Sequence, residues 1–223
     1  MSSSRRTATT AGILFLLTEI TAIAGLLLYR PLLHDPGYVL APGPDTRALL
    51  GAACELLLVA AVTGTAVTLY PVLRRRHEGL ALAHLCARLL EAAVITIGIL
   101  AVLAVVTLHG TAAGDPDATL AVARALTAVH DWTFLLGPNL ALGANTLLLA
   151  WLLHRARLVP RAITGLGLVG GPLIGVSGLC VLFGLYPQVS APGSLAALPV
   201  FAWEVALAVR LLTKGFSPAI LAR

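Results

Sequence analysis

The stretch LALAHLCARLLEAAVITIGILAVLAVVTL, from Leu80 to Leu108, decides the fold class of this chain. Its only acidic or basic side chains are His84, Arg88 and Glu91. A helix needs about 20 predominantly apolar residues to cross the hydrocarbon of a bilayer. The stretch meets this requirement with residues to spare, and it therefore predicts a transmembrane helix.

The rest of the chain has the same character. It is 58% hydrophobic and only 11% charged, which excludes a soluble globular domain. Five further apolar stretches are each near the length of a membrane span. The six expected spans are roughly 10–29, 48–70, 80–108, 126–153, 162–185 and 195–213. We therefore expect residues 1–223 to form one all-α domain, a polytopic membrane bundle of six transmembrane helices.

The fourth span carries a signal for an earlier start. Asp115-Pro116-Asp117 combines an N-cap residue with a proline at the first helical position, which is typical of a helix N-terminus. We therefore expect this helix to begin near Asp117, ahead of its apolar part.

Lysine and arginine predict the orientation of the chain. One set of span ends carries eleven basic residues, and the opposite set carries three. The first set is Arg5, Arg6, Arg74, Arg75, Arg76, Arg155, Arg157, Arg161, Arg210, Lys214 and Arg223. The second set is Arg30, Arg47 and Arg124. Because cytoplasmic loops carry the excess of Lys and Arg, we expect a multi-pass protein of the cell membrane with both termini cytoplasmic.

Several partner classes are not expected. The net charge of +5 comes from short clusters between spans, without a basic face bearing aromatics, so nucleic acid is excluded as a partner. Cys54, Cys86 and Cys180 lie in apolar spans and indicate packing residues rather than a disulfide or a metal site. No metal-ligand spacing, Walker sequence or dinucleotide fingerprint is present, so we expect no metal and no cofactor.

Five charged residues lie where the chain should cross the middle of the bilayer. They are Glu19, Glu55, Arg88, Glu91 and Glu204. Each costs at least about 2.5–3.5 kcal/mol at that depth, so their presence indicates a buried acidic cavity between helices. One arginine compensates one carboxylate well, and we therefore expect at least two of the four glutamates to be protonated at neutral pH.

Helical spacing places His84, Arg88 and Glu91 on one face, which should point into the bundle. Two interpretations of Arg88 and Glu91 remain open. They belong to the functional site, or they form a structural ion pair that fastens this span to a neighbour such as the second.

Further polar and aromatic residues lie near the intramembrane acids and are candidates for substrate binding. These are Phe15, His130, Asp131, Trp132, Asn139, Phe201 and Trp203. Aromatic faces beside an acid suit the stabilisation of a cation. The alternative is that Trp132 and Phe201 belong to the outer aromatic belt and that His130-Asp131 is a solvated pair. Tyr29, Tyr70 and Tyr186 are interpreted as interface anchors.

Short motifs along nearly the whole chain resemble one family. They are Arg88-x-x-Glu91, Leu158-Val159-Pro160-Arg161, Gly165-Leu166-Gly167, and Glu204 followed by Leu211-Leu212-Thr213-Lys214-Gly215-Phe216, together with His130. In these the chain resembles the domain of unknown function 4386 family of bacterial six-span integral membrane proteins. The resemblance implies a six-span fold and no established activity.

The residues themselves favour an enzyme acting on a hydrophobic, isoprenoid-like substrate. Glu19, Glu55, Glu91 or Glu204 would donate a proton to an alkene or epoxide as general acid, with Arg88 setting its acidity. In size, topology and intramembrane acids the chain resembles membrane-bound terpene cyclases, a class of isomerase, although no motif is shared.

Two other functions remain open. The same acids suit a proton relay in a small-molecule transporter, for which six spans would suffice as a homo-oligomer. An accessory or sensor membrane protein with a purely structural polar core is the third reading. For each of these three functions we expect the protein to contact the lipid bilayer.

Overall fold

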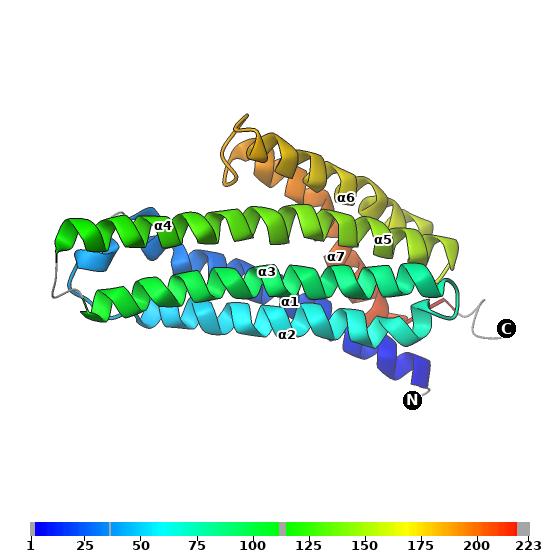
Figure 1. The fold of residues 1–223 in the computed structure, drawn as a ribbon. Coiled ribbons are helices and arrows are strands. Elements are labelled where there is room, and N and C mark those ends of the chain that lie inside the picture. The colour runs from blue at the N-terminus through cyan, green and yellow to red at the C-terminus, as the bar shows by residue number, and fades with distance from the viewer. Residues whose placement is uncertain (1–2, 36, 112–114, 218–223) are drawn as a thin grey trace.

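The computed structural model describes residues 3–35, 37–111 and 115–217, and every regular element in these ranges is helical (Figure 1). The elements are α1 (Ser3–His34), η1 (Tyr38–Leu40), α2 (Thr46–Leu73), α3 (Glu78–Thr111), α4 (Pro116–Leu135), η2 (Leu136–Ala141), α5 (Leu142–Arg155), α6 (Arg161–Leu182) and α7 (Ala191–Thr213). η1 is a 3-10 helix and η2 is a π-helix. The predicted all-α fold class is confirmed.

Six helical segments are long and apolar enough to cross a membrane, and α4, η2 and α5 together form the fourth. They lie where the apolar stretches predicted them, and most of them extend further because polar end turns carry no hydropathy signal. The early start of the fourth is confirmed. Asp115 is the N-cap of α4, and its carboxylate accepts a hydrogen bond from the Asp117 N–H at 3.0 Å.

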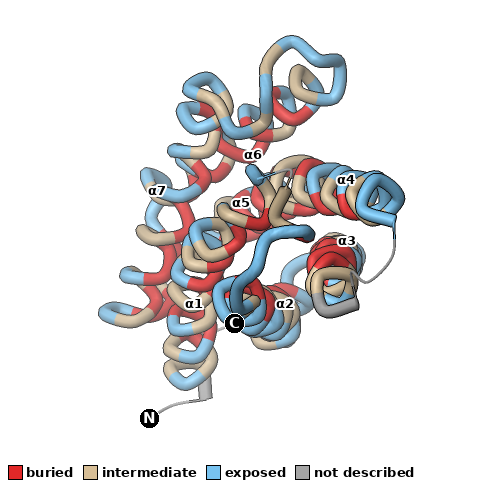
Figure 2. The backbone as a smooth tube through the Cα atoms, turned by 90° about the vertical axis from the view of Figure 1, so that its left-hand side faces the viewer, coloured by how far each residue is buried: buried red, intermediate tan, exposed pale blue. Residues whose placement is uncertain are grey.

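The helices form a closed ring in which α7 returns to α1. α1 packs against α2 and α7, α3 packs against α2 and the fourth span, and α6 lies between α5 and α7. The buried faces of the helices point inward (Figure 2). Arg5 donates to the carbonyl oxygens of Leu212 and Thr213 at 2.6 and 3.2 Å, which ties the start of α1 to the end of α7. Both therefore lie at one end of the bundle. Its placement in the cytoplasm stays a prediction, and Arg223 lies outside the described residues.

Glycines allow the backbones of the later helices to touch. A Cβ added to Gly143 would lie 2.8 Å from the Gly171 carbonyl oxygen, and one added to Gly171 would lie 2.7 Å from the Gly143 oxygen. A Cβ on Gly170 would meet the Val200 nitrogen at 2.9 Å. Small residues are needed at such contacts, and here they bring α6 against both α5 and α7.

Two apolar cores occupy the two ends of the bundle. The first includes Phe15, Leu69, Ala81, Leu153, Trp203 and Leu207. The second includes Tyr29, Val62, Ala92, Ile99 and Ala123. Glu19 lies between the two cores along α1, and Arg88 lies between them along α3. Glu19 and Arg88 thus lie at the junction of the cores.

The end of the bundle opposite to the start of α1 is built differently on its two sides. On one side the Tyr38 hydroxyl donates to Asp45 at 2.8 Å, and His109 Nδ1 lies 2.9 Å from both Asp45 carboxylate oxygens. These contacts hold η1, α2 and α3 together. On the other side α6 and α7 tilt away from α4 (Figures 1 and 2). A cavity lies there between α1, α4 and the end of α6.

Candidate functional site

Five polar residues from four helices meet at the junction of the two cores, and we call them the Arg88 cluster: Glu19, Arg88, Glu91, Asn145 and Glu204. Arg88 Nη1 donates to the Glu91 carboxylate at 3.3 Å, and Nη2 donates to Glu204 Oε1 at 3.0 Å. Asn145 Nδ2 donates to Glu91 Oε2 at 2.6 Å. The Glu19 carboxyl lies against that of Glu204. One guanidinium therefore faces three carboxyl groups.

Four of the five residues of the Arg88 cluster are buried, and Glu19 is half-buried. His84, Arg88 and Glu91 are each at most 3% exposed, which confirms that their shared face points into the bundle. The Phe15 ring lies 5.9 Å from the guanidinium carbon, within range of a cation–π interaction. The ion pair between Arg88 and Glu204 connects α3 to α7. The sequence had suggested α2 as an example of the neighbour that Arg88 and Glu91 would hold.

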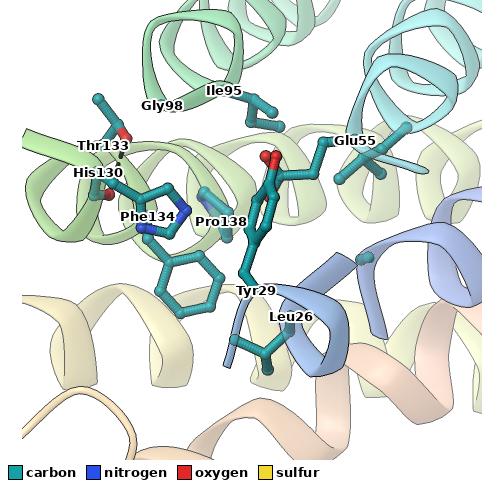
Figure 3. A pocket seen from close by; sticks show the side chains of 11 residues that line it. Leu26, Tyr29, Glu55, Ile95, Gly98, His130, Thr133, Phe134 and Pro138 are labelled. Atoms are coloured by element: carbon teal, nitrogen blue, oxygen red, sulfur yellow. Dashed lines mark hydrogen bonds between the residues drawn. The ribbon is translucent and has the colours of Figure 1, made fainter. Parts of the chain in front are cut away.

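The second acidic centre is a small cavity of about 60 Å³, which we call the inner cavity (Figure 3). Its polar lining comprises Tyr29, Glu55, His130 and Thr133, and its apolar lining includes Leu26, Leu58, Ile95 and Phe134. These residues come from α1, α2, α3 and α4, so the cavity lies between these four helices. Glu55 thus takes different partners from the other three glutamates.

Stacked rings position the groups of the inner cavity. The Tyr29 and His130 rings meet edge to face with centroids 5.6 Å apart, and His130 stacks on Phe134 at 6.4 Å. Tyr29 can lie in this place because Gly51 has no side chain, since a Cβ there would be 2.6 Å from the ring. The Tyr29 hydroxyl lies against the Glu55 carboxyl, although without the geometry of a hydrogen bond.

A larger cavity of about 440 Å³, the outer cavity, adjoins the inner one. The two share Leu26, His130 and Phe134 as lining residues. The outer cavity lies between α1, α4, the end of α6 and the segment before α7. Its walls include the apolar Leu33, Leu135, Val181 and Val189, and the polar His34, Asp131 and Gln188. We call the two together the joined cavity.

The predicted site residues fall into three groups. Phe15, Glu19, Arg88, Glu91 and Glu204 lie in or against the Arg88 cluster. Glu55, His130, Asp131 and Trp132 line the joined cavity.

The remaining three predicted residues belong neither to the Arg88 cluster nor to the joined cavity. Trp203 is fully buried against Gly167 of α6, and Phe201 is 44% exposed. Asn139 packs against Gly178. The acidic residues, which were expected in one buried cavity, are therefore divided between two centres.

Three polar residues of these centres, Tyr29, Thr133 and Asn145, were not identified from the sequence. Tyr29 was interpreted as an interface anchor, which is wrong, because its side chain is completely buried in the second core. Asn145 was not identified because regular α-helical spacing places it on a different face from Asn139, the predicted polar residue of this span. The π-helix η2 adds a residue to its turn and so changes the phase of the helix that follows. An asparagine within an apolar span was the available signal.

The described residues contain no group of three or more His, Cys, Asp or Glu side chains placed to hold a metal ion. The residues of both centres instead offer carboxyl, hydroxyl, imidazole and amide groups. Such groups bind polar atoms and transfer protons.

Comparison with known proteins places the chain in a family. The sequence model of the family described as Domain of unknown function (DUF4386) matches residues 10–215. No curated protein and no solved structure matches the chain. The matched region covers nearly all of the chain and includes the six apolar helices. This multi-pass membrane protein therefore belongs to the DUF4386 family.

Proposed function

We propose that this chain is a membrane enzyme that protonates an isoprenoid-like hydrophobic substrate, with Glu55 as the general acid. The proposal depends on the position of Glu55. Its carboxyl lines the inner cavity, whose walls are otherwise mostly apolar. Within the described ranges Glu55 forms no ion pair with Lys or Arg, so a cavity ligand meets its carboxyl without competition from a cation.

The shape of the joined cavity suits an elongated apolar ligand. The outer cavity, at about 440 Å³, is within the range of about 300–1,000 Å³ for ligand sites. The inner cavity has room only for one end of such a molecule. The outer cavity lies where α6 and α7 tilt away from α4, and the exposed side chains of Trp132 and Val189 flank it. A substrate dissolved in lipid would enter there.

The chemistry is an isomerisation that begins with proton transfer. Neutral Glu55 gives its proton to a substrate alkene carbon or epoxide oxygen, and the alkene π bond or the epoxide C–O bond breaks to leave a carbocation. A neighbouring double bond of the substrate then attacks and forms a C–C bond. Loss of a proton from the product cation to the Glu55 carboxylate restores the acid.

The residues around Glu55 support these steps. The ring faces of Tyr29 and Phe134 stabilise a cation near the inner cavity. The apolar walls exclude the water that would quench it. The Arg88 cluster has a different part in this scheme, because it joins α1, α3, α5 and α7 and so holds the bundle in which the cavity lies.

The test compares Glu55→Gln with Glu78→Gln, the same substitution at an exposed glutamate at the start of α3. Host cells expressing each variant are fed isoprenoid alkenes and epoxides, and their lipid extracts are analysed by mass spectrometry. We expect a cyclised isomer from wild type and Glu78→Gln, and a loss of about 10²–10⁴-fold with Glu55→Gln. An isomer that Glu55→Gln still forms at the full rate contradicts the role of Glu55. A folded wild type that forms no isomer contradicts the enzyme.

One observation favours proton-coupled transport as a second candidate. The fourth span is interrupted by the π-helix η2, and Pro138 of this segment lines the inner cavity. Transporters often place an irregular helix beside the substrate site. In this case vesicles containing the protein would take up protons only when a solute is added, and Glu55→Gln would abolish the uptake.

A further inference from the structure

We infer that the ligand of the joined cavity is an oxygen-bearing isoprenoid, an epoxide or carbonyl compound, and not a plain alkene. The inference rests on the proposed function and specifies its substrate class. It comes from three buried polar atoms without a hydrogen-bond partner: Tyr29 Oη, His130 Nδ1 and Gln188 Nε2. All three residues line the joined cavity.

Two of these atoms lie near a carboxyl group but outside the geometry of a hydrogen bond. Tyr29 is completely buried, and its hydroxyl lies against Glu55 without forming a hydrogen bond. His130 is 5% exposed, and its Nδ1 is 3.7 Å from the Asp131 carboxylate, which is too far for a hydrogen bond. Buried polar groups in proteins are nearly always hydrogen-bonded. Unpartnered groups in the walls of a cavity therefore indicate that a bound ligand supplies the partner once the walls adjust to it.

The chemistry of the unpaired groups indicates what the partner offers. The tyrosine hydroxyl and the glutamine amide nitrogen are hydrogen-bond donors, and a neutral histidine donates from one of its nitrogens. Protonated Glu55 is a further donor beside Tyr29. An ether, epoxide or carbonyl oxygen accepts such bonds and requires none in return. The hydrocarbon end of a plain alkene would leave all of these donors unpaired.

An epoxide fits the inner cavity in a specific way. Its oxygen would accept a hydrogen bond from Tyr29 and then the proton of Glu55. The C–O bond breaks as the O–H bond forms, so the oxygen leaves as a hydroxyl that remains part of the substrate. The positive charge stays on the carbon, next to the Tyr29 and Phe134 rings. Gln188, in the outer cavity, would bind a second acceptor further along the molecule.

Ordered water is the alternative occupant, because the inner cavity is large enough to hold it. Water would satisfy the same donors whichever ligand fills the outer cavity. The two explanations therefore differ in whether the oxygen of the ligand affects its affinity.

The experiment measures binding of two probes to the full-length purified protein in lipid nanodiscs. The probes are an isoprenoid alkene of fifteen carbons and its terminal epoxide. Binding is followed through the change in total tryptophan fluorescence, because Trp132 lines the outer cavity. We expect the epoxide to bind on the order of tenfold more tightly than the alkene. Tyr29→Phe, which removes only the hydroxyl, should reduce this preference to near unity. Tyr70→Phe, the same change outside the joined cavity, should preserve it.

Each other outcome has a definite meaning. Equal affinity of wild type for the two probes overturns the oxygen requirement and leaves the proposed function standing. No binding of either probe to a wild type that keeps its cooperative unfolding overturns the proposed function as well. An unchanged preference in both Tyr29→Phe and His130→Phe overturns the assignment of the oxygen to the inner cavity. The comparison of probes on wild type holds even where a variant fails to fold.

Discussion

Arg88 and Glu204 are 116 positions apart in the sequence, yet the Arg88 guanidinium donates to the Glu204 carboxylate at 3.0 Å. Both side chains are at most 5% exposed. The same guanidinium also binds Glu91, so one residue of α3 compensates carboxylates on two helices. A buried ion pair of this kind adds little net stability over an apolar pair, but breaking it leaves a charge without compensation.

The first prediction concerns this ion pair. Arg88→Gln should lower the free energy of unfolding by about 3–5 kcal/mol, because it leaves Glu91 and Glu204 together without a cation. The measurement is chemical unfolding in detergent micelles. Arg75→Gln, at an exposed position between α2 and α3, is the matched control and should unfold as the wild type does. Equal stability of the two variants would show that the Arg88 cluster does not hold the helices together.

Asn145 should contribute to stability where Asn139 does not. Asn145→Leu removes the 2.6 Å hydrogen bond to Glu91 and should cost about 1–2 kcal/mol of unfolding free energy. Asn139→Leu is the same change six residues earlier, at a half-buried position on η2, and should cost less. If thermal unfolding in detergent ranks the two variants in the opposite order, the phase of α5 after the π-helix is wrong.

The stability of the protein should fall in alkaline solution through Tyr38, which lies in η1 outside the membrane spans. Burial and the hydrogen bond to Asp45 raise the pKa of Tyr38 from 10.0 to about 12. Between these values the folded protein holds a proton that the unfolded chain has lost. The contribution is therefore complete below about pH 10 and is lost as the pH rises to about 12.

The measurement for Tyr38 is the unfolding midpoint of wild type and Tyr38→Phe across this range. The difference between the two proteins should shrink as the phenol ionises, because the variant has no proton to lose at this position. A difference that stays constant up to about pH 12 would contradict the contribution of Tyr38.

The sequence alone predicted most of the fold, because the local amino-acid composition indicates where each helix lies along the chain. The run from Leu80 to Leu108 is long and apolar, and it became the central part of α3. Asp115 and Pro116 marked the start of α4 by local capping chemistry. How the helices pack as a ring depends on contacts between distant positions, such as Arg5 with Leu212, and no local pattern encodes these.

The candidate site was predicted as a set of residues but not as an arrangement. The cost of burying charge identified Glu19, Glu55, Arg88, Glu91 and Glu204 as residues that need partners. Which partners they take depends on the rotation of each helix about its axis.

Two features set that rotation, and neither can be recognised from the amino-acid composition. One is the extra residue of η2, and the other is the absence of a side chain at Gly51, which makes room for Tyr29. The acidic residues therefore form two centres instead of the one predicted cavity.

The last prediction tests the inner cavity through Gly98 of α3, which lines it. A Cβ at this position would lie 2.6 Å from Thr133 Oγ1 and 3.6 Å from the His130 ring. Gly98→Ala should therefore displace Thr133 toward the cavity, at a cost of about 1–3 kcal/mol in stability. Affinity for the isoprenoid epoxide should fall several-fold. Gly165→Ala, where a Cβ has open space, should not lower the stability or the affinity.

A double variant separates the clash from other effects of the alanine. Thr133→Ala removes the hydroxyl that Gly98→Ala would strike, so the combined variant should recover stability and affinity relative to Gly98→Ala alone. The Thr133 hydroxyl donates only to the His130 carbonyl of its own helix, at 2.8 Å, so its loss should cost little. If the two changes are simply additive, Gly98 and Thr133 do not meet, and the inner cavity does not have the walls described for it.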